Sequence, residues 1–153
     1  METNMSPIIR LKDVIEGIHA IDDEVRGFLN VRTGRVVMLS VDDLDAAANG
    51  STENAMAQEV LRSSDYRELP DQFEIDDYSI MQQFCETVDD DPLRRGLLRS
   101  MQGRGASMRI RHTVHEYGVE EAWSAFRKEA LRPIAIEWLE KHELDSYPGY
   151  SEL

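Results

Sequence analysis

The sequence predicts a mostly helical α+β domain in which an N-terminal helix and a β-hairpin pack on a helical bundle. Three observations favour this fold class. Apolar residues recur at helical spacing near the N-terminus, two short apolar runs flank a glycine-containing turn, and five or more stretches of helical periodicity follow. The 153 residues are close to the usual length of one domain. We therefore expect a single domain over residues 1–145 and a flexible tail over residues 146–153.

The first predicted elements are a helix and a hairpin. A helix that ends near residue 22 is predicted from the helical spacing of Leu11, Val14, Ile15, Ile18 and Ile21. Two strands are predicted over Val25–Asn30 and Arg35–Ser40, because Gly34 can adopt the positive φ that a short hairpin loop needs. An isolated hairpin is barely stable in water, so we expect helices to pack against it.

Helical stretches fill the rest of the chain. Ser40 is a suitable N-cap for the first of them, and Asp91, followed by Pro92, is a suitable N-cap for a later one. Pro133 removes a backbone donor inside the last stretch, which predicts a kink or two abutting helices there. The predicted helices span residues 41–49, 53–64, about 76–88, 91–101, 106–117 and from 119 to beyond 138.

The composition restricts the partners and the compartment. Thirty acidic residues against 17 Lys and Arg give a net charge of −13, which disfavours non-specific binding to nucleic acid or to an anionic membrane. The one cysteine, Cys85, cannot form an intrachain disulfide. No export signal and no apolar run of membrane-spanning length occur. We therefore expect a cytoplasmic protein with no membrane partner, and the sequence allows a homodimer.

The acidic residues are unevenly placed, and this is the least ordinary feature of the chain. Leu93–His115 contains no Asp or Glu, and we call it the arginine-rich corner. Arg95 and Arg99 share one helical stripe. The candidate residues for binding an anion or a partner in this corner are Arg95, Arg99, Arg104, Arg109, Arg111, His112 and His115.

The preferred interpretation is a non-enzymatic binding or adaptor domain that engages an acidic protein or phosphates through this corner. A guanidinium suits this role because it can hold an oxyanion with two parallel hydrogen bonds. In the competing structural interpretation, the arginines pair with the protein's own carboxylates. Two other functions stay open: a phosphate-ligand protein or enzyme that uses the Arg and His of the corner, and an acidic inhibitor or antitoxin-like protein.

No catalytic residue, metal site or cofactor is predicted. His112 and His115 lie at a spacing that a metal can use, but they lack the zinc-protease arrangement. Cys85 lies on an apolar helix face, where a free cysteine is usually a buried small hydrophobe. No glycine-rich phosphate loop and no nucleophile elbow is found.

Several longer stretches resemble one bacterial family. Residues 24–37 are similar to its hairpin, and the resemblance continues through Leu69–Ile75, Tyr78–Cys85 and Leu97–Trp138. On these residues the chain resembles uncharacterised protein family 0158, although Pro133 departs from the polar residue expected there. The resemblance implies one bacterial cytoplasmic domain, and it brings no activity, substrate or catalytic residue with it.

Overall fold

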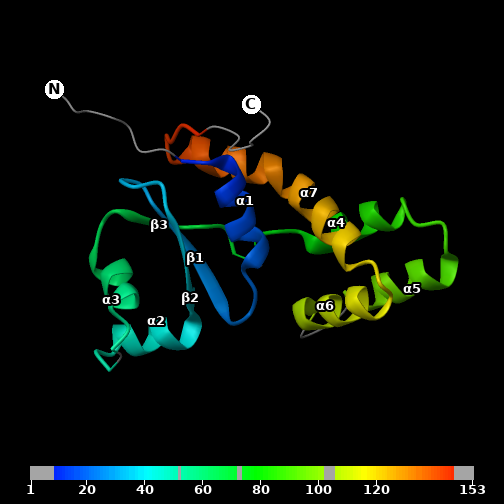
Figure 1. Cartoon of the computed structure of the whole chain (residues 1–153), viewed down its shortest axis with the longest axis horizontal. Coiled ribbons are helices and arrows are strands. Elements are labelled where there is room, and N and C mark those ends of the chain that lie inside the picture. Colours follow the sequence, from blue (N-terminus) through cyan, green and yellow to red (C-terminus); the bar gives the residue numbers. More distant parts are fainter. Residues whose placement is uncertain (1–8, 52, 72–73, 102–105, 147–153) are drawn as a thin grey trace. The chain divides into compact units, whose positions relative to one another are not determined.

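The computed structural model describes residues 9–51, 53–71, 74–101 and 106–146, with side chains from 109 onward in the last range (Figure 1). The elements, in chain order, are α1 (Leu11–Ala20), β1 (Val25–Asn30), β2 (Val36–Ser40), α2 (Val41–Ala48), α3 (Ala55–Arg62), β3 (Tyr66–Glu68), α4 (Asp77–Cys85), α5 (Asp91–Arg99), α6 (Ala106–Glu116) and α7 (Glu120–Lys141). Helices predominate and one small antiparallel sheet accompanies them, so the predicted α+β class is confirmed.

The chain divides into two compact units. Residues 1–71 and 132–153 belong to unit 1, and residues 72–131 belong to unit 2. The single domain over residues 1–145 stays a prediction. The predicted tail lies outside the described residues from position 147 onward.

Unit 1 is built on a three-stranded antiparallel sheet with the order β2-β1-β3. The hairpin register pairs Val25 with Ser40 and Leu29 with Val36, in agreement with the predicted strands. The third strand, β3, was not predicted; it pairs with the other side of β1, where Asn30 faces Tyr66. A strand of three residues is too short to show the alternation that would identify it in a sequence.

Helices cover both faces of this sheet (Figure 1). A Cβ at Gly17 of α1 would lie 2.9 Å from side-chain atoms of both Leu69 and Val36, so α1 approaches one face closely at this glycine. On the opposite face, Phe28 and Leu39 pack with residues of α2 and α3 in a second apolar cluster. The hairpin therefore gains the apolar cover that it cannot supply alone.

Side-chain caps set the starts of two helices. The Ser40 hydroxyl accepts a hydrogen bond from the Asp43 N–H at 3.0 Å, as predicted for the start of α2. The predicted cap of α5 was wrong by one residue. Asp90 is the N-cap and accepts from the Leu93 N–H at 3.0 Å, whereas Asp91 lies inside the first turn. Asp90 has the extended backbone that a cap requires.

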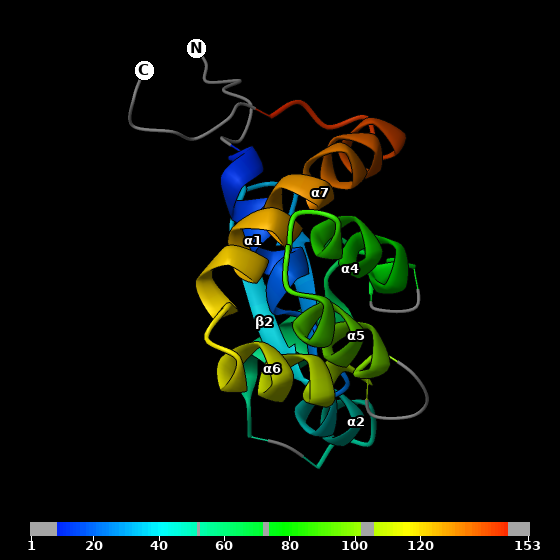
Figure 2. The same ribbon diagram turned by 90° about the vertical axis from the view of Figure 1, so that its right-hand side faces the viewer.

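Unit 2 has a core of aromatic residues from α4 and α7. The Phe84 ring lies 5.5 Å from the rings of both Trp123 and Phe126. Helix α5 packs with α4 and also with α6, and Figure 2 shows α5 and α6 side by side. Of the two outcomes expected around Pro133, two abutting helices are excluded, because α7 runs through this proline as one helix, and a kink there stays a prediction. Pro133 has no N–H, so the Glu129 carbonyl lacks its helical donor, and both residues are exposed.

Candidate functional site

The arginine-rich corner corresponds to α5, α6 and the segment that joins them (Figure 2). Leu97, Ile110 and Val114 are buried on the apolar faces of the two helices. The opposite faces carry the exposed side chains of Arg95, Arg99, Arg111, His112 and His115. Arg109 is half-buried, and the predicted candidate Arg104 lies outside the described residues.

Some basic side chains of the corner interact with the protein itself. Arg94 forms an ion pair with Asp91 within α5. The His112 Nε2 atom lies 3.6 Å from a Glu116 carboxylate oxygen, and the His115 Nδ1 atom lies 3.3 Å from a Glu120 carboxylate oxygen. Arg109 and Arg111 also interact with other groups. Pairing with internal carboxylates therefore applies to a part of the corner.

Arg95 and Arg99 differ from these neighbours. Both are exposed, and neither forms an ion pair or a side-chain hydrogen bond within the part of the chain that the structure describes. They lie four residues apart on α5, so their Cβ atoms are about 6 Å apart on one face of the helix. Both side chains are therefore exposed to solvent.

Tyr117 adds an aromatic side chain to this surface. A Cβ at Gly96 would lie 2.8 Å from the Tyr117 hydroxyl oxygen, so the phenol rests on the helix surface at this glycine. Gly96 follows Arg95 directly and lies three residues before Arg99. The Tyr117 side chain is 48% exposed. A glycine inside an otherwise regular helix was the available signal for a close approach.

A metal centre or a nucleophile would need grouped His, Cys, Asp or Glu side chains or an ionisable thiol. No three His, Cys, Asp or Glu side chains of the described residues are grouped so that they could hold a metal ion. Cys85 is buried, as predicted, and burial raises the pKa of its thiol, an effect that the nearby Arg94 charge partly offsets. A thiol with a raised pKa is a poor nucleophile near neutral pH.

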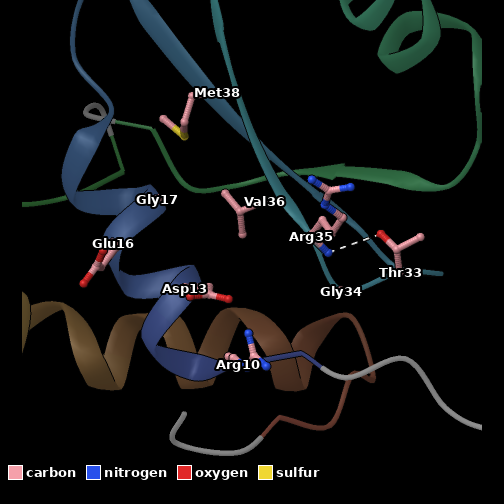
Figure 3. A pocket seen from close by; sticks show the side chains of 9 residues that line it. All are labelled: Arg10, Asp13, Glu16, Gly17, Thr33, Gly34, Arg35, Val36 and Met38. Atoms are coloured by element: carbon pink, nitrogen blue, oxygen red, sulfur yellow. Dashed lines mark hydrogen bonds between the residues drawn. The ribbon is translucent and has the colours of Figure 1, made fainter. Parts of the chain in front are cut away.

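Unit 1 contains a groove that the sequence pattern did not predict (Figure 3). It lies between α1 and the hairpin and has a volume of about 530 Å³. Its lining residues are Arg10, Asp13, Glu16, Gly17, Thr33, Gly34, Arg35, Val36 and Met38. Asp13 is half-buried, Arg35 is exposed, and Val36 and Met38 belong to strand β2. The groove thus combines charges of both signs with an apolar strand.

A second, shallower groove follows the outer surface of α7 in unit 2. Its volume is about 590 Å³, and its lining includes three glutamates, Glu120, Glu121 and Glu129, beside Lys128.

None of the helices in the described ranges is sufficiently long and apolar to cross a membrane.

Comparison with known proteins gives the family and no closer relative. No curated protein and no solved structure matches the chain. The model of the uncharacterised protein family UPF0158 matches residues 5–148, a range that covers both units. The chain therefore belongs to the uncharacterised protein family UPF0158.

Proposed function

We propose that this protein is a non-enzymatic binding or adaptor protein that engages an acidic segment of a partner protein through the arginine-rich corner. The observation that carries the proposal is the exposure of Arg95 and Arg99, which have no internal partner among the described residues. This is unusual in a chain with 30 acidic residues, where internal pairing is easily satisfied.

The geometry of α5 suits a carboxylate-bearing peptide. Two guanidinium groups one helical turn apart can each hold a carboxylate with two parallel hydrogen bonds. Tyr117 lies against Gly96 of the same helix and offers an apolar ring with a polar tip. Arg and Tyr are the side chains that most often dominate binding energy at protein interfaces.

An acidic protein segment fits better than nucleic acid. With a net charge of −13, the chain as a whole repels a polyphosphate, whereas a short acidic segment interacts mainly with the local positive surface. The proposed setting is the bacterial cytoplasm, where Cys85 stays reduced.

The same exposure argues against acid–base catalysis in the corner. The His112 and His115 side chains are 74% and 77% exposed, and each lies beside a glutamate. A catalytic histidine is normally held in a pocket, within hydrogen-bond reach of a bound substrate. These two histidines instead extend the surface that a partner would contact.

The test compares two double variants with the same change in net charge. Arg95→Glu/Arg99→Glu reverses the proposed site, and Arg32→Glu/Arg62→Glu reverses two exposed arginines of unit 1. Both tagged proteins are checked for folding by circular dichroism and then used in pull-downs from lysate of the source organism, with and without nuclease. A captured protein is then titrated against each variant.

We expect the corner variant to bind the captured protein at least about tenfold more weakly than the wild type, which corresponds to about 1.4 kcal/mol. The unit 1 variant should bind as the wild type does. Equal binding by all three proteins would exclude the corner as the binding surface. Capture that disappears with nuclease would show that the partner is a nucleic acid and would refute the proposal.

A further inference from the structure

Strand β2 lies at one end of the sheet, and no strand of the described residues covers its outer side. In an antiparallel pair, alternate residues direct their N–H and C=O groups toward the partner strand. The Asn30 N–H donates to the Arg35 carbonyl at 2.9 Å, and the Val41 N–H donates to the Glu24 carbonyl at 2.9 Å. By this alternation Val37 and Leu39 bond to β1, while the N–H groups of Val36, Met38 and Ser40 point away from it.

These outward groups have no acceptors in the described part of the chain. None of the three N–H groups, and neither of the Val36 and Met38 carbonyls, makes a hydrogen bond there. The free edges of sheets are usually protected by charged residues, by proline or by being very short. The opposite edge, β3, has three residues, two of them charged, whereas β2 has five residues and no charge.

The groove described above gives room beside this edge. Figure 3 shows the Val36 and Met38 side chains directed toward α1, with the groove opening next to them. A second strand paired to β2 would place its own side chains on this face. The volume of about 530 Å³ is enough for several apolar side chains.

We infer that the free edge of β2 pairs antiparallel with β2 of a second copy of this chain. The arrangement that uses all three outward positions places Met38 opposite Met38, and Val36 opposite Ser40. The Ser40 N–H then donates to the Val36 carbonyl of the other copy, and the two sheets join into one of six strands.

The charges at the two ends of β2 support a second copy as the occupant. Arg35 directly precedes the strand and Asp42 lies two residues beyond its end, and both are exposed. Neither side chain forms an ion pair or a hydrogen bond among the described residues. With Met38 opposite Met38, Arg35 of each copy faces Val41, the first residue of α2, in the other copy and lies one residue from Asp42, so the edge is complementary to itself.

The first test removes one outward N–H group. Ser40→Pro deletes this donor at a residue whose φ of −74° already suits proline. Ser40→Ala is the matched control, because it loses the same hydroxyl cap and keeps the N–H group. Sedimentation of the full chain over a wide concentration range should show a dimer for the wild type and for Ser40→Ala, and a monomer for Ser40→Pro. A wild type that is monomeric throughout, or a Ser40→Pro variant that dimerises equally well, overturns the inference.

The second test reads the register and does not depend on the proline variant. In the inferred pair the two Met38 Cα atoms lie about 5.5 Å apart, within the range that a disulfide spans. Under mild oxidation Met38→Cys should form a disulfide-linked dimer, whereas the neighbouring Val37→Cys should not, because Val37 faces Leu39 of the other copy. Equal cross-linking of both variants, or of neither, overturns the inferred pairing.

The third test concerns the charges. Arg35→Glu should weaken the dimer, and Arg35→Glu/Asp42→Arg should restore it. A double variant as weak as the single one would contradict the inferred contact. Arg95→Glu/Arg99→Glu should leave the dimer unchanged, so this inference and the proposed function succeed or fail separately.

Discussion

Replacing Asp77 by asparagine removes the carboxylate that balances a buried guanidinium in unit 2. The Arg127 Nε and Nη2 atoms donate to the two Asp77 oxygens at 2.6 Å and 3.1 Å. The side chains of Arg127 and Asp77 are 9% and 23% exposed. Removing one partner of a fully buried ion pair costs about 3–5 kcal/mol, because the remaining charge stays buried. Since Asp77 is in part accessible to water, we expect Asp77→Asn to lower the free energy of unfolding by about 2–3 kcal/mol.

The assay is urea unfolding followed by circular dichroism, with Glu68→Gln as the control. Glu68 pairs with Arg26 at 2.8 Å, and these side chains are 41% and 39% exposed. Loss of that exposed pair should cost less than about 1 kcal/mol. If Asp77→Asn costs no more than Glu68→Gln, the reasoning from burial is refuted. The double variant Asp77→Leu/Arg127→Met should be less destabilised than Asp77→Asn, because it leaves no buried charge.

Three further changes test other parts of the structure. Gly17→Ala should lower the free energy of unfolding by about 1–2 kcal/mol, because the new Cβ would lie 2.9 Å from Leu69 Cδ1. This loss should outweigh the higher helix propensity of alanine. Greater stability of the variant would show that α1 can move away from the sheet. Asp90→Ala should cost about 1 kcal/mol in the same assay. Asp91→Ala should cost less, and the reverse order would contradict the assigned cap. Burial raises the pKa of the Cys85 thiol, so the folded protein resists its ionisation, and stability should fall as pH rises from the ordinary thiol pKa to the raised value. Urea midpoints measured over this alkaline range, with Cys85→Ser as control, check the sign.

Much of the fold could be predicted because the pattern of apolar residues is itself a consequence of packing. Helix α1 and the hairpin follow the spacing of their buried side chains. Strand β3 could not be predicted in this way, since its pairing depends on β1, some 40 residues earlier in the chain. The cap of α5 was ambiguous because three consecutive aspartates, Asp89–Asp91, all suit the position, and only the backbone angles select Asp90.

The candidate surfaces, too, could be predicted from the sequence only in part. Because Leu93–His115 contains no acidic residue, the sequence alone made Arg95 and Arg99 candidate binding residues. Whether each arginine meets a carboxylate depends on side-chain contacts that spacing does not encode, and Arg94 and Arg95 differ in this respect although they are neighbours. The buried Arg127 and the free edge of β2 were not predicted, because both arise from contacts between separate elements.

The order in which the chain is synthesised affects the two units differently. Unit 2 is a continuous segment, residues 72–131, whereas unit 1 combines residues 1–71 with residues 132–153. A nascent chain therefore contains every residue of unit 2 before unit 1 has received its final segment. A premature stop after residue 131 would remove residues from the unit that holds the N-terminal sheet and leave the sequence of α4–α6 intact. A truncating mutation near the 3′ end of the gene would thus alter the unit that contains the N-terminal residues.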